Sequence, residues 1–263
     1  MSTACIARQW ITCYYLHHMK VSVVIPAYNE EKWISKALDA VLKQDYPDYE
    51  VIVVDNASSD KTSEIVETYV KKDSRVFLVR EPKKGLLNAR EAGRLKAAGQ
   101  IIAQMDADCI PHSTWISDAI SFFETEKIVG VTGPYRFYDA SPAIRTALGI
   151  GQKYIYWPAS VFLRTVGKGG VYVGGNFFIR ASTLKEIGGY DTSIDFYSED
   201  SDTGYRLSKI GTVLYEPKIA VDSSARRFQA FGFKKLNNLY TKAFLTVLSG
   251  KKLKDNTETN HPR

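Results

Sequence analysis

The sequence predicts an α/β fold in which a mostly parallel central sheet carries helices on both faces. Four short apolar runs, at residues 21–25, 49–54, 75–79 and 100–105, are typical of buried strands. Segments with apolar residues at helical spacing separate these runs from one another. Because parallel neighbours require a long crossover connection, usually a helix, this alternation favours a parallel sheet.

Local signals place the remaining elements. Asn29 is expected to cap the first helix, with Glu30 and Glu31 in its first turn, where the helix dipole favours acidic residues. Apolar residues of that helix recur at Ile34, Leu38, Val41 and Leu42. Later helices are predicted around residues 65–70, at 86–98 and at 199–209, and a basic amphipathic helix is predicted at 231–248.

Length and composition indicate a globular protein with anionic partners. The 263 residues suit one large domain or one domain with appendages, and the 44% hydrophobic and 24% charged fractions are ordinary. The net charge of +6 favours nucleic acid, acidic lipid or a phosphorylated small molecule. Cys5, Cys13 and Cys109 are scattered and odd in number, which argues against a disulfide framework and favours a reducing, cytoplasmic location.

The two ends of the chain differ in character from the middle. Residues 1–18 show no cleavable signal pattern, and Met19 stands directly before the first predicted strand. We therefore expect Met19 to be the biological start and residues 1–18 to be a disordered or mis-assigned extension. Residues 230–263 form a separate basic segment in which an amphipathic helix precedes a polar tail. No apolar run reaches the length that a membrane-spanning helix requires.

Polar residues follow three of the predicted strands. Residues 26–30 follow the first strand, Asp55 the second, and Asp106 and Asp108 the fourth. Because the ends of parallel strands meet at one edge of the sheet, we expect these groups to share one crevice. A set of unrelated solvated turns is the alternative for each group taken alone.

Asp106 and Asp108 are the most informative pair. Two carboxylates at i and i+2 on extended backbone point the same way, with α-carbons about 6.6 Å apart. Magnesium and similar hard cations bind one or two carboxylates together with substrate phosphates. The simpler arrangement is that one carboxylate binds the metal and the other contacts another part of a nucleotide. The D-x-D string alone, however, is common by chance.

Together, these motifs resemble family 2 glycosyltransferases, which have the nucleotide-diphospho-sugar transferase fold called GT-A. The match covers about residues 19–227. It rests, in family order, on Pro26-Ala-Tyr-Asn-Glu30, Val54-Asp55-Asn-Ala-Ser-Ser-Asp60, Asp106-Ala-Asp108, Gly174-Gly-Asn176 and Glu199-Asp200. The resemblance implies a nucleotide-binding half at residues 19–110 and an acceptor half at residues 111–229.

The resemblance also assigns roles to individual residues. It implies that Asp108 is the ligand of a divalent metal, Mn²⁺ or Mg²⁺, and that Asp200, beside Glu199, is the catalytic base. Gly174, Gly175 and Asn176 match the strand beneath the sugar and acceptor, although the glycines would equally mark a bulge. The residues that it implies for nucleotide-sugar binding are Pro26, Ala27, Tyr28, Glu30, Asp55, Arg90 and Asp106.

Where processive synthases of this family carry Gln-x-x-Arg-Trp, this chain has Ser224, Ala225, Arg226, Arg227 and Phe228. We therefore expect a non-processive enzyme in which Arg226 and Arg227 neutralise the leaving diphosphate, since arginine matches phosphate oxygens. A solvated or lipid-facing basic pair is the alternative.

The expected partners are a nucleotide-diphospho-sugar, with a bias toward uridine, and a sugar or lipid-linked sugar acceptor; nucleic acid is not among them. The basic amphipathic helix suggests peripheral contact with an anionic membrane surface, or else a closing helix packed on the sheet. A non-catalytic sugar-nucleotide or membrane-associated binding protein, and a nucleotidyltransferase of similar fold, remain the alternative functions.

Overall fold

The structure is a computed structural model that describes residues 19–165, 172–194 and 199–232, together with residues 235, 236, 238 and 242. Residues 1–18, and with them the expected N-terminal extension, lie outside the described residues. So does most of the helix predicted at 231–248, although Leu236 is described and buried. The helix that is described here is α10 (Arg226–Phe231), which ends before Gly232 at a φ of 79°.

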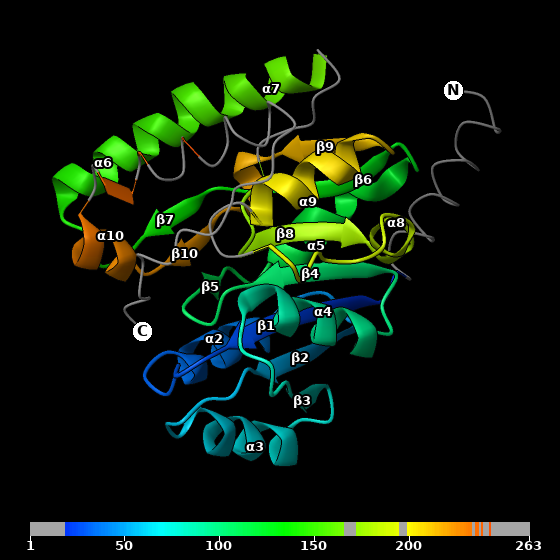
Figure 1. The fold of residues 1–263 in the computed structure, drawn as a ribbon, viewed down its shortest axis with the longest axis vertical. Helices are drawn as coiled ribbons and strands as arrows, with labels where there is room; N and C mark the ends of the chain where they lie inside the picture. Colours follow the sequence, from blue (N-terminus) through cyan, green and yellow to red (C-terminus); the bar gives the residue numbers. More distant parts are fainter. Residues whose placement is uncertain are drawn as a thin grey trace.

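In the described part of the chain, seven strands form the central sheet in the order β3-β2-β1-β4-β8-β6-β9 (Figure 1). Only β8 among them runs antiparallel to its neighbours. The sequence predicted the first four strands, β1 to β4, and their parallel order. The strands are β1 (Val21–Ala27), β2 (Tyr49–Asp55), β3 (Val76–Arg80), β4 (Ile101–Met105), β6 (Ile128–Thr132), β8 (Asn176–Arg180) and β9 (Thr212–Tyr215).

Helices cover both faces of the sheet, as predicted, and two buried clusters show which helix packs where. On one face, alternate β1 residues such as Val23 and Ile25 pack with the helices α2 (Ile34–Val41), α3 (Thr62–Lys72) and α5 (Trp115–Ile120). On the other face, Val24 packs with the helices α4 (Leu86–Lys96), α8 (Ala181–Glu186) and α9 (Glu199–Ser208). The short helix η1 (Ser121–Glu124) extends α5.

The strand register opens a crevice beside β1. β1 pairs with β2 as far as Ala27 and Asp55, but its pairing with β4 ends at Val24 and Gln104. Beyond that point β1 and β4 separate, so Pro26, which has no N–H to donate, causes no gap in the ladder. A second sheet of β5 (Ile110–Pro111), β10 (Val221–Ser223) and β7 (Tyr135–Phe137) lies next to this edge; η3 (Pro217–Ile219) precedes β10.

The expected helix cap at Asn29 is wrong. Helix α2 begins at Ile34, and Asn29 has a φ of 55° and accepts a hydrogen bond from Ser59 N–H at 2.8 Å. The loop after β2 thus uses the Asn29 oxygen that would have capped the helix, and Glu30 and Glu31 lie in the turn before α2. The helix therefore starts one turn later than local sequence signals indicate.

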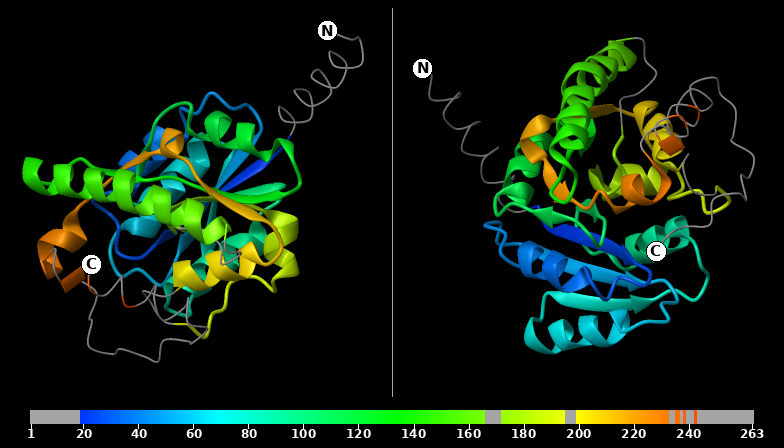
Figure 2. Two further views of the ribbon diagram at one scale, coloured as in Figure 1. Left: turned by 90° about the horizontal axis from the view of Figure 1, so that it is seen from above. Right: turned by 90° about the vertical axis from the view of Figure 1, so that its left-hand side faces the viewer.

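A helical rod leaves the body of the protein after β7. It consists of α6 (Pro142–Gly151), a π-helical turn η2 (Gln152–Tyr156) and α7 (Trp157–Thr165), which run end to end (Figures 1 and 2). Ser141 caps its first turn by accepting from Ile144 N–H, and Pro142 occupies the first position, where its missing N–H costs nothing. No helix in the described ranges is long and apolar enough to cross a membrane.

Candidate active site

The ends of β1, β2 and β4 meet at one edge of the sheet, as the sequence predicted. The antiparallel β8 starts at this edge, which brings Gly174 and Gly175 beside the end of β4; the Asp106 N–H donates to the Gly175 carbonyl at 3.3 Å. Helix α9 also begins here, with Glu199 and Asp200 in its first turn. Residues from both halves of the sequence therefore line a single crevice.

Arg90, on α4, joins the first aspartate of the D-x-D motif to the expected base. It is 2% exposed, and its Nη1 lies 2.9 Å from Asp200 Oδ1 while its Nη2 lies 3.8 Å from Asp106 Oδ1. A buried guanidinium is costly unless it is paired with carboxylates, and these two supply the pairing. Arg90 is thus an internal bridge between the two motifs, not a solvated helix residue.

The two glycines permit both carboxylates to approach the backbone. Gly174 N–H donates to Asp200 Oδ2 at 3.0 Å, and a methyl group at Gly174 would lie 1.8 Å from Asp200 Oδ1. A methyl group at Gly175 would lie 2.2 Å from both Asp106 Oδ2 and the Tyr135 hydroxyl. Any side chain larger than hydrogen at these two positions would collide with the carboxylates. Close approach of the carboxylates to the backbone, and not a strand bulge, therefore explains the two glycines.

Asn176 has a structural role. It is fully buried; its Oδ1 accepts from Trp115 Nε1 at 2.9 Å and its Nδ2 donates to the Ile219 carbonyl at 2.8 Å. These bonds tie β8 to α5 and η3. The expectation that Asn176 contacts the sugar or acceptor is therefore not supported for its side chain, which is directed into the core.

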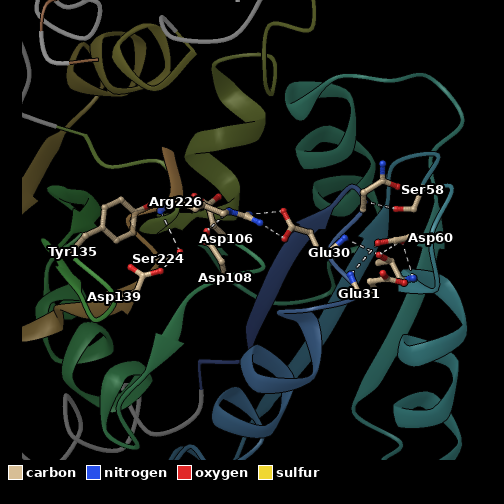
Figure 3. A network of polar contacts seen from close by, with 12 residues as sticks. Glu30, Glu31, Ser58, Asp60, Asp106, Asp108, Tyr135, Asp139, Ser224 and Arg226 are labelled. Carbon is tan, nitrogen blue, oxygen red and sulfur yellow. Dashed lines mark hydrogen bonds and ion pairs between the residues drawn. The ribbon is translucent and has the colours of Figure 1, made fainter. Parts of the chain in front are cut away.

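Arg226 connects Asp108, the second aspartate of the D-x-D motif, to the loop after β1 (Figure 3). Its Nε lies 2.9 Å from Asp108 Oδ2, and its two terminal nitrogens donate to both oxygens of Glu30 at 2.8 and 2.6 Å. The guanidinium also lies over the Trp33 ring at 5.9 Å. Burial raises the pKa of Asp108 to about 6, against the opposing charges of Arg226 and Arg227. The expected diphosphate ligand Arg226 is therefore engaged with protein carboxylates here.

Asp108 and Asp106 supply two of the ligands that a divalent metal uses, and substrate phosphates would supply others. In the described ranges, no three His, Cys, Asp or Glu side chains gather as a metal cage. Mg²⁺ and Mn²⁺ are commonly held by one or two carboxylates and by substrate phosphates, which matches this pair. Asp222, in β10, is ion-paired with Arg136 at 2.9 Å, and 42% of its side chain is exposed.

A separate hydrogen-bond network holds the loops after β1 and β2, where the sequence predicted nucleotide contacts. Asp55, at the end of β2, accepts from Ser58 N–H at 3.1 Å and from the Ser63 hydroxyl at 2.5 Å. Lys84 donates to the Tyr28 hydroxyl at 3.0 Å and lies over its ring. Pro26 and Ala27 are the last buried residues of β1. These groups form the wall of the crevice on the β2 side.

Glu199 and Asp200 are neighbours in very different surroundings. Glu199 is 5% exposed, and burial together with the Asp200 charge raises its pKa to about 8. Its neutral form is therefore favoured more strongly than that of a glutamate in water. Asp200 is held by Arg90 and by Gly174 N–H, with a third of its side chain exposed to solvent. Of the two carboxyl groups, Asp200 is the one suited to accept a proton.

Tyr135 was missed as a site residue. Its hydroxyl donates to Asp106 Oδ2 at 3.3 Å, from the segment after β6. Because β6 is parallel to β4, Tyr135 reaches the same edge, and recognising β6 as a strand would have indicated this. Two further residues near this site make structural contacts: Asp202 pairs with Arg206 at 2.7 Å within α9, and Cys109 is fully buried.

Comparison with known proteins agrees with this geometry. The model of glycosyl transferase family 2 matches residues 22–188, more than half of the chain. The chain belongs to glycosyl transferase family 2. The matched range includes Glu30, Asp55, Arg90, the Asp106–Asp108 motif and the glycine pair, and it ends before Asp200 and Arg226.

Relatives in family 2 resemble the chain over part of their length. Glycosyltransferase AglE of Haloferax volcanii is 31% identical over 197 residues, which cover 72% of this chain and 63% of AglE. Probable glycosyltransferase YdaM of Bacillus subtilis is 30% identical over 200 residues, which cover 73% of this chain and 47% of YdaM. The chain thus spans less than two thirds of the length of these relatives.

Solved structures show that the fold is GT-A. The mannosyltransferase PcManGT of Pyrobaculum calidifontis, in complex with GDP-Man and Mn²⁺, aligns at a TM-score of 0.68 and 21% identity, covering 94% of this chain and 73% of that one. TarS of S. aureus in complex with UDP-GlcNAc aligns at 0.60 and 22% identity, covering 79% and 59%. The expected fold class is therefore confirmed.

Proposed function

We propose that this family 2 protein is an inverting, non-processive glycosyltransferase that moves a sugar from a nucleotide-diphospho-sugar to an acceptor hydroxyl. One observation carries the proposal: Arg90 pairs with both Asp106 of the D-x-D motif and Asp200 of α9. A metal-site motif and a positioned carboxylate thus lie on the two sides of one buried cation. The gap between them is where the reacting sugar would lie.

The donor that we propose is a uridine diphosphate sugar. Asp55 is fixed at the end of β2 by Ser58 and Ser63, and each of its oxygens keeps a lone pair for a base N–H. Tyr28, with Lys84 over its ring, supplies an aromatic face at the same wall. The structural neighbours bind GDP-Man in one case and UDP-GlcNAc in another, so the nucleotide is a question for experiment.

The reaction is a single displacement. Asp200 accepts the proton of the acceptor hydroxyl, whose oxygen attacks the anomeric carbon as the bond from that carbon to the diphosphate oxygen breaks. The nucleoside diphosphate leaves, and the configuration at the carbon inverts. A divalent ion held by Asp108, with Asp106 beside it, would neutralise charge on the leaving group. Arg226 and Arg227 begin α10 at the same crevice and add positive charge there.

Arg90 and Gly174 act by positioning. Both contact the Asp200 carboxylate, from a buried side chain and from a backbone N–H respectively. Their bonds leave the carboxylate little freedom to rotate, which reduces the entropy lost on reaching the reactive geometry. We further propose a lipid-linked or cell-envelope glycan as acceptor, so that the protein works at the periphery of a membrane.

Donor binding and the outcome of transfer test the proposal. A panel of nucleotide sugars is screened for a rise in melting temperature with and without Mn²⁺, and the product linkage is determined by NMR. The expected results are metal-dependent stabilisation by a uridine diphosphate sugar and an inverted anomeric configuration. Asp108→Ala should lose the metal dependence, whereas Asp222→Ala, a carboxylate paired outside the crevice, should keep it. Binding without turnover of any donor would favour a non-catalytic binding protein.

A further inference from the structure

The helical rod at residues 142–165, which we call the arm, exposes an unusual amount of apolar surface. Four of the seven large hydrophobic side chains that are exposed in the described part of the chain lie on it: Ile150, Tyr154, Trp157 and Phe162. Each is between 48% and 64% exposed. Ile150, Tyr154 and Trp157 follow one another at intervals of four and three residues across the π-helical turn η2, which keeps them close together on the rod, and Phe162 lies five residues further along it. Scattered single exposures need no explanation, but a continuous stripe indicates a binding surface.

The opposite side of the arm is fixed to the protein. Ile144 and Leu148 pack against Phe137 and Ala225 near the second sheet. One turn further on, Gln152 accepts from Tyr135 N–H at 2.8 Å and donates to the Tyr135 carbonyl at 2.9 Å. The stripe is therefore not the buried side of a misplaced helix, because the arm already has an apolar inner side in contact with the body.

The charges of the arm favour an anionic surface. The arm contains Arg145, Lys153 and Arg164, and the sequence has no Asp or Glu from residue 140 to residue 185. Lys153 is exposed and lies 5.3 Å from the centre of the Tyr154 ring, whereas Arg145, also exposed, donates to the Tyr138 and Ala140 carbonyls at 3.0 and 3.3 Å. A second copy is a poor occupant, because a symmetric contact between two arms would bring like charges together with no carboxylate on either arm to offset them.

We propose that the arm docks in the interface of a membrane that contains anionic lipid. Its stripe would lie among the headgroups and upper acyl chains, where tyrosine and tryptophan are favoured, and its cations would lie at the lipid phosphates. A helix of this kind lies in the membrane plane and does not span it. The proposal is independent of which donor the enzyme uses.

Docking by the arm would place the active site close to the lipid surface. Gln152 holds the main chain of Tyr135, and the Tyr135 hydroxyl donates to Asp106 Oδ2 at 3.3 Å. The arm and the D-x-D motif are thus connected through a single residue. An acceptor anchored in the bilayer would reach the crevice without leaving the membrane.

Vesicle co-sedimentation of the full chain tests the proposal. At low salt the protein should sediment with phosphatidylcholine–phosphatidylglycerol vesicles and much less with phosphatidylcholine alone, and added salt should weaken binding. The double variant Trp157→Ser, Phe162→Ser should bind at least about tenfold more weakly, because it loses two aromatic side chains from the interface. Leu95→Ser, which makes the same kind of change at a 70% exposed position on α4, should bind as the wild type does.

Two charge-reversal variants and a fluorescence measurement test the membrane proposal independently of the co-sedimentation of the double variant. Lys153→Glu should weaken vesicle binding, whereas Lys71→Glu on α3, at the far end of the molecule from the arm (Figure 1), should not. Trp157→Phe keeps an apolar ring and should bind vesicles normally, but it should lose the part of the fluorescence that brominated lipids quench. All arm variants should retain the wild-type affinity for UDP, so a failure here is distinct from a failure of the proposed donor.

Three results would overturn the proposal: no association with anionic vesicles at low salt, equal losses in the arm variants and their controls, or no difference in lipid quenching between wild type and Trp157→Phe. If light scattering instead showed a dimer that the double variant dissociates, the stripe would belong to a contact between two copies. If the wild type did not bind vesicles and the arm variants lost binding to an acidic protein, the stripe would belong to a contact with a protein partner.

Discussion

Arg226 and Glu30 are 196 positions apart in the sequence and form an ion pair with two hydrogen bonds, at 2.8 and 2.6 Å. The same guanidinium lies 2.9 Å from Asp108 through its Nε. One cation from α10 therefore lies between two carboxylates, one from the loop after β1 and one from the loop after β4. A divalent ion at Asp108 would have to share that carboxylate with Arg226.

Arg226→Gln should bind Mn²⁺ alone more tightly than the wild type. Removal of the competing cation frees Asp108 and Glu30, and we expect about a tenfold gain, equivalent to roughly 1.4 kcal/mol for one partly buried ion pair. Isothermal titration calorimetry without nucleotide measures it. Arg136→Gln, which removes the exposed partner of Asp222, should leave Mn²⁺ affinity unchanged. Equal or weaker metal binding in Arg226→Gln would show that Arg226 does not compete with metal for Asp108.

Asp200→Asn should leave donor binding nearly intact and reduce turnover at least ~100-fold, the lower end for loss of a general base. The side chain keeps its size, but both Asp200 oxygens accept hydrogen bonds, from Arg90 and from the Gly174 N–H, so the amide keeps only one of these acceptors. Calorimetry of the donor complex and a steady-state transfer assay separate the two effects. If transfer survived, another group would have to accept the proton.

Gly174→Ala should impair turnover although it adds only a methyl group. That methyl group would lie 1.8 Å from Asp200 Oδ1, so the carboxylate must move, and a displacement of about 1 Å from the reactive geometry costs roughly 100-fold. Gly149→Ala, on α6 with nothing near the added methyl group, should keep full activity. It should also gain up to about 1 kcal/mol of stability from better helix propensity. Comparable activity in both variants would contradict the close contact at Gly174.

Glu199→Gln should be more stable than the wild type at alkaline pH. The pKa of Glu199 rises from an ordinary 4.5 to about 8 in the fold, so between these values the native state binds more protons than the unfolded state. Stability of the wild type therefore falls as pH rises through this window, by at most about 1.4 kcal/mol for each pH unit. Glutamine resembles the neutral acid and avoids this loss.

Thermal melts of wild type and Glu199→Gln from pH 5 to pH 9 give the measurement. The difference in melting temperature should grow in favour of the variant with rising pH. Glu64→Gln, at an exposed position of α3, should follow the wild type throughout. A difference that stays constant with pH would mean that Glu199 ionises normally in the fold.

Much of the fold could be predicted because strand and helix periodicities are local. The apolar runs at 49–54 and 100–105 lie within β2 and β4, or one residue beyond, and parallel order then placed Asp55, Asp106 and Asp108 at one edge. Asn29 shows where local reasoning fails. Its side-chain oxygen could either cap the following helix or accept a hydrogen bond from Ser59, and the fold brings Ser59, in the loop after β2, within reach of it. The exposed apolar surface of the arm could not be predicted in this way, since exposure depends on what packs beside the helix.

The sequence alone determined that Asp106, Asp108, Glu199 and Asp200 are acidic residues at the end of a strand and at the start of a helix. Only the tertiary structure decided which of them differ in charge and in partner. Glu199 and Asp200 are adjacent, and no local pattern separates them. Burial makes the charged form of Glu199 unfavourable, while Arg90, 110 positions from Asp200 in the sequence, pairs with the Asp200 carboxylate. Desolvation and long-range ion pairs depend on distances in space, which the spacing of residues along the chain does not specify.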